Sequence, residues 1–316
     1  MRNFRLIPDD TRIPFVRYRY WAYAFSGALI LLTLILLPTR GLNLGIDFQG
    51  GILIEVGMPT AAPDLAAMRT TLSDLELGEV ALQEFGRPSD ILIRVEHQAG
   101  GEEGQLAAVN EVKAALAERF GNDVSYRRVE FVGPKVSEDL LWAGTQATVY
   151  ALIAILDYVW FRFEWQFAVG AVVALIHDAV TTLGLFSLLG LEFNLASIAA
   201  ILTIIGYSIN DTVVIYDRVR ENLRRYKAMP LPELIDRSIN ETLARTVMTS
   251  FTTLLALIAL LIAGGPTIRG FTIAMIWGVV IGTYSTIYVA SPMVLHLHLS
   301  REPTPQAAET PEAEAD

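Results

Sequence analysis

Asp211 is the residue of this chain whose position most directly suggests chemistry, because it lies inside the apolar run Leu195–Val219. An ionised carboxylate near the centre of a bilayer costs about 2.5–3.5 kcal/mol on insertion scales. Such a group normally faces a helix bundle or a wet cavity and finds a partner there. At 1.5 Å per residue, Asp211 lies roughly 24 Å from Leu195, which is beyond the midplane. It therefore either carries a proton inside the membrane or lies at the inner interface.

Arg245 is the candidate partner of Asp211, because it opens the next apolar run in the string LARTVMTSFTT. Desolvation and a nearby cation shift the pKa of a carboxyl in opposite directions, so a group held between them can load and unload a proton near neutral pH. Asn210, which precedes Asp211, completes this predicted site. In the competing interpretation, Arg245 is a positive anchor whose head group reaches lipid phosphate.

His177 and Asp178 form a second ionisable pair, within the apolar string FAVGAVVALIHDAVTTLGLF. Histidine has the unperturbed pKa nearest to physiological pH, so the pair is a candidate part of a proton relay. A structural polar contact between helices is an alternative, and metal binding is a third that lacks a second spaced motif. We predict no cofactor and no enzyme activity, because we find neither a nucleophile–base set nor a phosphate loop.

The composition is that of a protein that crosses the membrane several times. The 316 residues are 53% hydrophobic and only 18% charged, with a mean hydropathy of +0.42, which excludes an ordinary soluble enzyme. The net charge of −10 lies mostly in residues 40–138 and in the tail, so a nucleic-acid partner is not expected. The absence of cysteine excludes disulfides and thiol chemistry.

Six apolar runs are long enough to cross a bilayer, which needs about 17–25 residues. They are Tyr20–Leu37, Leu140–Phe161, Trp165–Leu189, Leu195–Ile215, Val247–Ala263 and Phe271–Leu295. The first run is too long for a signal-peptide core and has no A-x-A-like site after it, so we expect a retained helix.

Lysine and arginine in the short flanks predict the orientation. Five arginines precede the first run, and seven basic residues lie between the fourth and fifth runs. Both termini are therefore expected in the cytoplasm, with residues 1–19 as a cytoplasmic N-terminus and 216–246 as a cytoplasmic loop. The protein would be a multi-pass protein of the bacterial inner membrane, with a disordered cytoplasmic tail at 301–316.

Residues 39–138, between the first run and the bundle at 139–300, are expected to form a periplasmic domain. The pattern predicts strand Ile52–Val56, helix Ala62–Leu75, strand Val80–Phe85, strand Ile91–Val95, helix Glu103–Phe120 and strand Val124–Val132. This βαββαβ order is typical of the ferredoxin-like arrangement.

Two further patterns predict how helices pack. Leu231, Leu234, Ile235, Ile239 and Leu243 give the loop 216–246 an amphipathic helix, expected at the membrane surface. Gly278 and Gly282 form a GxxxG pair, which indicates close helix packing in the last run.

Several longer strings together resemble a known family. GLNLGIDFQGG, VGPKVSEDL, HDAVTTLGLFSLLGLEFNL, IGYSINDTVVIYDRVREN and LARTVMTSFTT are similar to motifs of the SecF family, subunits of the SecDF complex of the bacterial protein-export translocase. The resemblance covers nearly the whole chain apart from the tail. It also implies kinship with the resistance-nodulation-division transporters.

The resemblance implies that the protein couples the proton-motive force to preprotein translocation and release on the periplasmic side. It implies SecD and the SecYEG channel as partners, together with a YidC-type insertase, YajC, membrane lipids and the translocating preprotein. Asp211 and Arg245 match positions tied to proton movement in the family, and His177 and Asp178 match its HD motif. The alternatives are a proton-coupled solute exporter or a passive scaffold for SecD and the channel. The coupling ion could be a proton or sodium, and the Asp–Arg pairing favours the proton.

Overall fold

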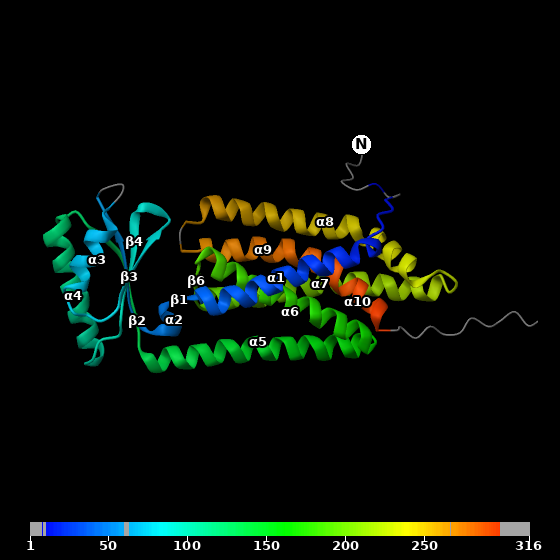
Figure 1. The fold of residues 1–316 in the computed structure, drawn as a ribbon, viewed down its shortest axis with the longest axis horizontal. Helices are drawn as coiled ribbons and strands as arrows, with labels where there is room; N and C mark the ends of the chain where they lie inside the picture. The colour runs from blue at the N-terminus through cyan, green and yellow to red at the C-terminus, as the bar shows by residue number, and fades with distance from the viewer. Residues whose placement is uncertain (1–7, 9–10, 60–62, 266, 298–316) are drawn as a thin grey trace, which may run out of the picture.

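The computed structural model describes residues 8, 11–59, 63–265 and 267–297. The tail predicted to be disordered, 301–316, and most of the first ten residues lie outside this range. Figure 1 shows a long bundle of helices with a small sheet domain beyond one of its ends.

Six helical segments of the described chain are long and apolar enough to cross a membrane, as the six apolar runs predict. They are α1 (Arg19–Arg40, preceded by the short turn η1, Val16–Tyr18), α5 (Pro134–Arg162), α6 (Trp165–Leu189), α7 (Leu195–Arg225), α8 (Leu231–Ala263) and α9 (Arg269–Ser285), which continues through the π-helical turn η2 (Thr286–Ala290) into α10 (Ser291–His296). The start of α1 meets the end of α10, where the rings of Tyr23 and His296 lie 5.9 Å apart.

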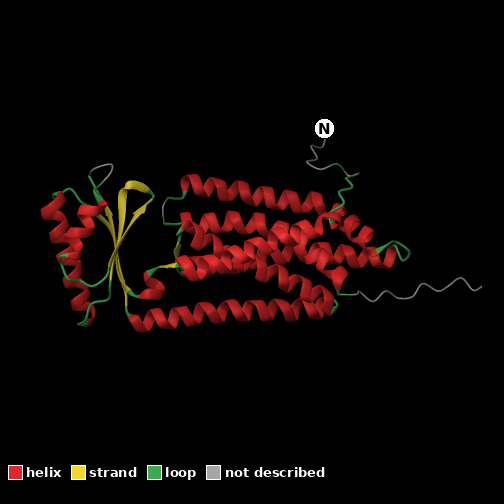
Figure 2. Ribbon diagram, in the orientation of Figure 1, coloured by secondary structure: helices red, strands yellow, loops and turns green. Residues whose placement is uncertain are grey.

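The sheet domain follows the predicted order of strands and helices. Its elements are β2 (Gly51–Gly57), α3 (Leu65–Ser73), β3 (Val80–Phe85), β4 (Arg87–Val95), α4 (Gly101–Phe120) and β5 (Ser125–Val132). The four strands are antiparallel in the order β3-β4-β2-β5. Helices α3 and α4 cover one face, on the side away from the bundle (Figure 2). Alternate strand residues, among them Ile52, Ile54 and Ile93, form a buried core with these helices.

The arrangement differs from the prediction by a second, smaller sheet. Strand β1 (Asn43–Leu44) pairs in parallel with β6 (Glu192–Phe193), and the short helix α2 (Ile46–Gln49) follows β1. Strands of two residues carry no readable periodicity, so the sequence could not predict this pairing. Gly51, at the start of β2, needs to be glycine, because its φ is +104° and a Cβ there would lie 2.5 Å from the Val95 carbonyl oxygen.

The predicted cytoplasmic loop at 216–246 is mostly helix. Helix α7 continues to Arg225 and α8 begins at Leu231, so only residues 226–230 connect them. The amphipathic segment also does not lie free at a membrane surface, because Leu234, Ile235 and Ile239 are buried against a core that includes Tyr216. The periodicity correctly predicts an apolar face, but it does not reveal that this face packs on the protein.

Candidate functional site

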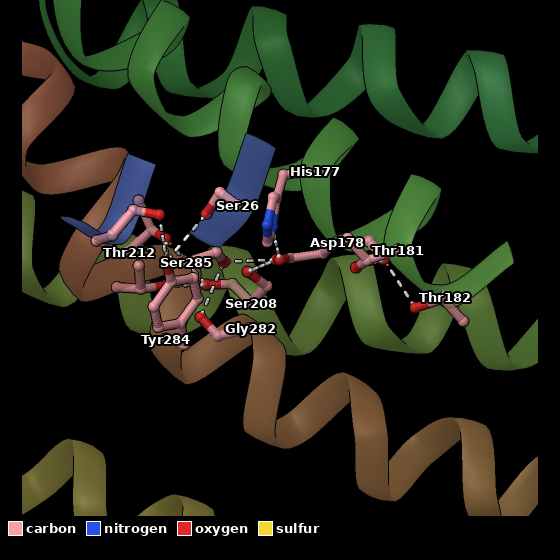
Figure 3. Close-up of polar contacts among 12 residues, drawn as sticks. Ser26, His177, Asp178, Thr181, Thr182, Ser208, Thr212, Gly282, Tyr284 and Ser285 are labelled. Carbon is pink, nitrogen blue, oxygen red and sulfur yellow. Dashed lines mark hydrogen bonds and ion pairs between the residues drawn. The ribbon is translucent and has the colours of Figure 1, made fainter. Parts of the chain in front are cut away.

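Asp178 links three helices, α6, α7 and α9 (Figure 3). Its side chain on α6 is fully buried, and its Oδ2 accepts hydrogen bonds from Ser208 Oγ of α7 at 2.7 Å and from Ser285 Oγ of α9 at 2.8 Å. Its Oδ1 lies 3.0 Å from His177 Nδ1. Hydrogen-bonded partners of this kind are what a buried carboxylate needs, because an unpaired one is costly to desolvate. The carboxylate therefore fixes α7 and α9 relative to α6.

Glycines allow α9 to approach α7 closely at this point. A Cβ on Gly282 would lie 3.2 Å from Ser208 Cβ, and a Cβ on Gly278 would overlap the Ile204 side chain. The close packing predicted from the GxxxG pair is therefore confirmed. It brings Ser285 within reach of Asp178.

The π-helical turn η2 directly follows Ser285. Thr286 Oγ1 lies 2.8 Å from Thr212 Oγ1, and Ser291 Oγ donates to the Thr286 carbonyl oxygen at 2.8 Å. Tyr216 OH donates to the Ala290 carbonyl oxygen at 3.0 Å. Isolated π-turns occur frequently at functional sites. Sequence reasoning missed this turn and Ser285, although the hydroxyl residues clustered at 283–286 in an apolar run were a readable signal.

The His177 ring lies beside the Asp178 carboxylate (Figure 3). It lies 6.2 Å from the Tyr284 ring, whose hydroxyl is 3.0 Å from Ser26 Oγ and donates to the Ala22 carbonyl oxygen at 2.7 Å. His177 Nε2 is buried and has no hydrogen-bond partner among the described residues. The described chain also holds no group of three or more side chains suited to a metal ion.

Asp211 occupies a separate place on α7. Its side chain is buried, and its Oδ1 accepts a hydrogen bond of 2.8 Å from Thr246 Oγ1 of α8. Its Oδ2 is buried without a hydrogen-bond partner in the part of the chain that the structure covers. Because buried polar atoms are normally satisfied, an orphaned carboxylate oxygen marks a place for a proton, water or another polar group.

The expected ion pair between Asp211 and Arg245 is absent from the described structure. Arg245 is exposed at the bundle surface, and no ion pair within 4.0 Å joins it to Asp211. Thr246 occupies the facing position instead, because successive residues of a helix point about 100° apart. Asn210 is exposed as well. The structure therefore brings His177 and Asp178 together, but leaves both Arg245 and Asn210 outside the buried site.

A further polar contact crosses the bundle near Asp211. Tyr207 OH of α7 donates to Ser250 Oγ of α8 at 3.2 Å, and Ser250 Oγ lies 2.7 Å from Thr283 Oγ1 of α9. The surfaces of α7, α8 and α9 that meet here are lined with hydroxyl groups. Such groups can hold water or pass a proton without carrying a charge of their own.

Two protein-family profiles match this chain. "Protein export membrane protein SecD/SecF, C-terminal" covers residues 111–300, and "SecD/SecF GG Motif" covers residues 35–58. The second range holds β1, α2 and the paired glycines that open β2.

Curated relatives match almost from end to end. The protein translocase subunit SecF of Rickettsia felis is 46% identical over 290 residues, which are 92% of this chain and 93% of the relative. The SecF subunit of Rhodobacter capsulatus is 47% identical over 311 residues, covering 95% of this chain and 93% of the relative.

Two solved structures of SecDF share the fold. One is the translocon-associated membrane protein SecDF from Thermus thermophilus, with a TM-score of 0.84 and 36% identity over 92% of this chain. The other is SecDF in a super-membrane-facing form, with a TM-score of 0.67 and 35% identity over 91% of this chain. This chain spans 39% of each of those longer chains. With near-complete matches to curated SecF subunits, the chain belongs to the SecF family of protein translocase subunits.

Proposed function

We propose that this protein works with a SecD partner beside the SecYEG channel and uses the proton-motive force to help preproteins leave on the outer side. The observation that carries this proposal is the environment of Asp211, which is buried in an apolar helix with one carboxylate oxygen bonded to Thr246 and the other unpartnered in the described chain. A carboxyl inside the membrane raises the free energy of insertion, so its presence there indicates a functional role.

In this mechanism Asp211 takes up a proton at its free oxygen, Oδ2. Neutralisation changes how α7 packs against α8, and release of the proton to the other side restores the first arrangement. Each proton that moves down 100 mV releases about 2.3 kcal/mol, so a few protons suffice to repack helices against one another. Arg245 contributes its charge from the exposed surface of α8, and Asn210 is exposed on α7.

His177 and Asp178 have a supporting part in the proposal. Asp178 already has three hydrogen-bonding contacts from side chains, so its first task is to hold α6, α7 and α9 in register. His177 Nε2 has no hydrogen-bond partner among the described residues, so it is the atom of this pair that is open to a relay. The structural contact between helices and the relay interpretation of this pair are therefore compatible.

The membrane topology and the fold of the sheet domain are also part of the proposal. We infer a multi-pass protein of the inner membrane with both termini in the cytoplasm, and a periplasmic domain at 39–138. The start of α1 and helix α10 meet at the end of the bundle away from the sheet domain (Figure 1), which supports both termini lying on the same side. The strand order β3-β4-β2-β5, with both helices on one face, supports a ferredoxin-like arrangement of that domain.

The experiment that tests the function replaces Asp211 by asparagine in the complex with SecD. Proton-dependent export should be lost while the complex still assembles. Normal export by this variant would favour the passive scaffold. A transport defect for small solutes without preprotein accumulation would favour an exporter of the resistance-nodulation-division type.

A further inference from the structure

The sheet domain is joined to the membrane bundle through Arg94 of β4. Arg94 projects from the face of the sheet opposite α3 and α4, next to the buried Leu92 and Leu53. Its guanidinium donates to the Leu44 carbonyl oxygen at 2.8 Å, to Asn43 Oδ1 at 2.8 Å and to Gln83 Oε1 at 2.9 Å. All three acceptors are neutral, so the planar guanidinium fixes an orientation through these bonds, while its charge also acts on the nearby Glu192 carboxyl.

The chain segment that Arg94 contacts is itself held by the bundle. Asn43 and Leu44 pair with Glu192 and Phe193, which lie between α6 and α7. Asn43 Nδ2 also donates to the Gly190 carbonyl oxygen at 3.0 Å, immediately after α6. Arg94 and the end of α6 are therefore linked through a single residue, Asn43.

Asp47 makes the corresponding link to α7. Its Oδ2 accepts a hydrogen bond of 2.9 Å from the backbone N–H of Leu195, the first residue of α7. The first N–H groups of a helix have no partner within the helix, and a carboxylate there is favoured by the helix dipole. Through this contact α2 holds the outer end of the helix that carries Asp211.

Beside this junction the sheet and the bundle are separated by a cleft. A cleft of about 440 Å³ lies between them, lined by Asp47, Arg128, Glu192 and Phe271 among others. Figure 1 shows that the sheet domain connects to the bundle at α2 and at the start of α5. The contacts of Asn43, Asp47 and Arg94 therefore form a small junction with open space beside it.

We propose that Arg94 is a positioning residue which, with Asn43 and Asp47, makes the sheet domain turn with the outer ends of α6 and α7. A shift of α7 during proton transfer would then move the whole domain as one body. The movement of the domain during proton transfer rests on the proposed function, whereas the fixed orientation of the domain follows from the contacts themselves.

The absence of native cysteine permits a direct test with two spin labels in the full chain, assembled with SecD in vesicles. One label replaces Asn110 on the exposed side of α4, and the other replaces Ile262, which is 81% exposed at the outer end of α8. The distance distribution between them reports the orientation of the domain. It is recorded with and without a proton gradient.

Three substitutions are compared on this background. Arg94→Gln removes the planar guanidinium and its charge, and Arg94→Lys keeps the charge without the guanidinium. Arg69→Gln removes an exposed arginine of the same domain as a control. We expect Arg94→Gln and Arg94→Lys to broaden the distribution and to abolish its gradient-dependent shift, while Arg69→Gln behaves like the parent. Unchanged hydrogen-exchange protection of β2 and β4 shows that the domain remains folded.

The outcomes separate the two proposals. If the parent shifts with the gradient and Arg94→Gln shifts equally with no broadening, the role of Arg94 is overturned while the proposed function stands. If the parent shows no gradient-dependent shift, proton coupling to this domain fails, and broadening by Arg94→Gln still supports the junction. A loss of exchange protection in Arg94→Gln that Arg94→Lys does not share would assign Arg94 to domain folding and overturn the positioning role.

Discussion

Thr246 Oγ1 donates a hydrogen bond of 2.8 Å to Asp211 Oδ1. The helix expected to meet Asp211 with a cation therefore meets it with a neutral hydroxyl. A hydroxyl can serve both charge states of the carboxyl, because it donates to the ionised form and can accept from the protonated form. A direct ion pair with Arg245 would instead favour the ionised form alone.

Removal of the Thr246 hydroxyl should impair proton coupling. Thr246→Val keeps the shape of the side chain and leaves Asp211 without its only side-chain donor in the described chain. Hydrogen bonds to charged groups contribute about 1.5–3 kcal/mol, so we expect proton-dependent export to fall by roughly tenfold or more. Thr246→Ser should retain activity. Thr252→Val is the control, because the Thr252 hydroxyl is exposed and donates only within α8; equal effects of the two valine variants would contradict the prediction.

Arg245 should act through its charge and not through a specific contact. Because its side chain is exposed and has no ion pair with Asp211 in the described structure, Arg245→Lys should keep proton-dependent export and Arg245→Gln should lose it. Export assays in vesicles with an imposed gradient measure this difference. Arg224→Gln, at another exposed arginine, controls for the total number of basic residues. Full export by Arg245→Gln would assign Arg245 to lipid anchoring.

The hydrogen bonds of Asp178 should contribute to stability in a measurable, coupled way. Ser208→Ala and Ser285→Ala each remove one donor to the same oxygen. Interhelical hydrogen bonds in membranes average about 0.6 kcal/mol and reach about 1.7 kcal/mol. Each substitution should therefore lower the free energy of unfolding by an amount in this range. Because both donors share one acceptor, the stability lost in the double variant should differ from the sum of the losses in the two single variants. Thr203→Val is the control, because the Thr203 hydroxyl donates to the Ala199 carbonyl oxygen within α7 and to no other helix of the described structure. Strict additivity would indicate that the two bonds to Asp178 are independent.

Glu192, at the junction between the sheet domain and the bundle, should make stability depend on pH. Burial raises the pKa of its carboxyl and Asp47 adds to this, although Arg94 and Arg128 oppose the shift. The folded state then holds the proton more tightly than the unfolded state, so stability is highest below the unfolded pKa and falls as pH rises through the folded pKa.

Glu192→Gln should therefore stabilise the protein at neutral pH and flatten its pH profile. Thermal unfolding of the detergent-solubilised complex between pH 4 and pH 8 would check this. Glu118→Gln, at an exposed site on α4, should leave the profile of the parent unchanged. If the stability of Glu192→Gln depended more steeply on pH than that of the parent, Arg94 and Arg128 would outweigh burial in setting the pKa of Glu192.

Much of the fold was readable from sequence because it depends on local patterns. The six long apolar helices follow from run length, and the order of strands and helices in the sheet domain follows from local patterns in the sequence. The β1–β6 pairing joins residues almost 150 positions apart through strands of two residues. No local pattern could indicate such a contact.

The candidate site was predictable in its carboxylates but not in their partners. Asp178 and Asp211 stand out because charge in an apolar run is rare. Which neighbour faces each of them depends on the rotation of α8 and α9, and one residue turns a helix by about 100°. That rotation places Thr246 inward and Arg245 outward, and the approach of α9 at Gly282 brings Ser285 to Asp178.

Proton coupling requires the Asp211 carboxyl to change its charge. Infrared difference spectra of the complex in vesicles, with Asp211→Asn used to assign the carboxyl band, would follow its protonation as the pH and the gradient change. We expect the Asp211 carboxyl to gain and lose a proton within the physiological pH range, and we expect an imposed gradient to shift this balance. A carboxylate that stays ionised throughout, with and without the gradient, would contradict it.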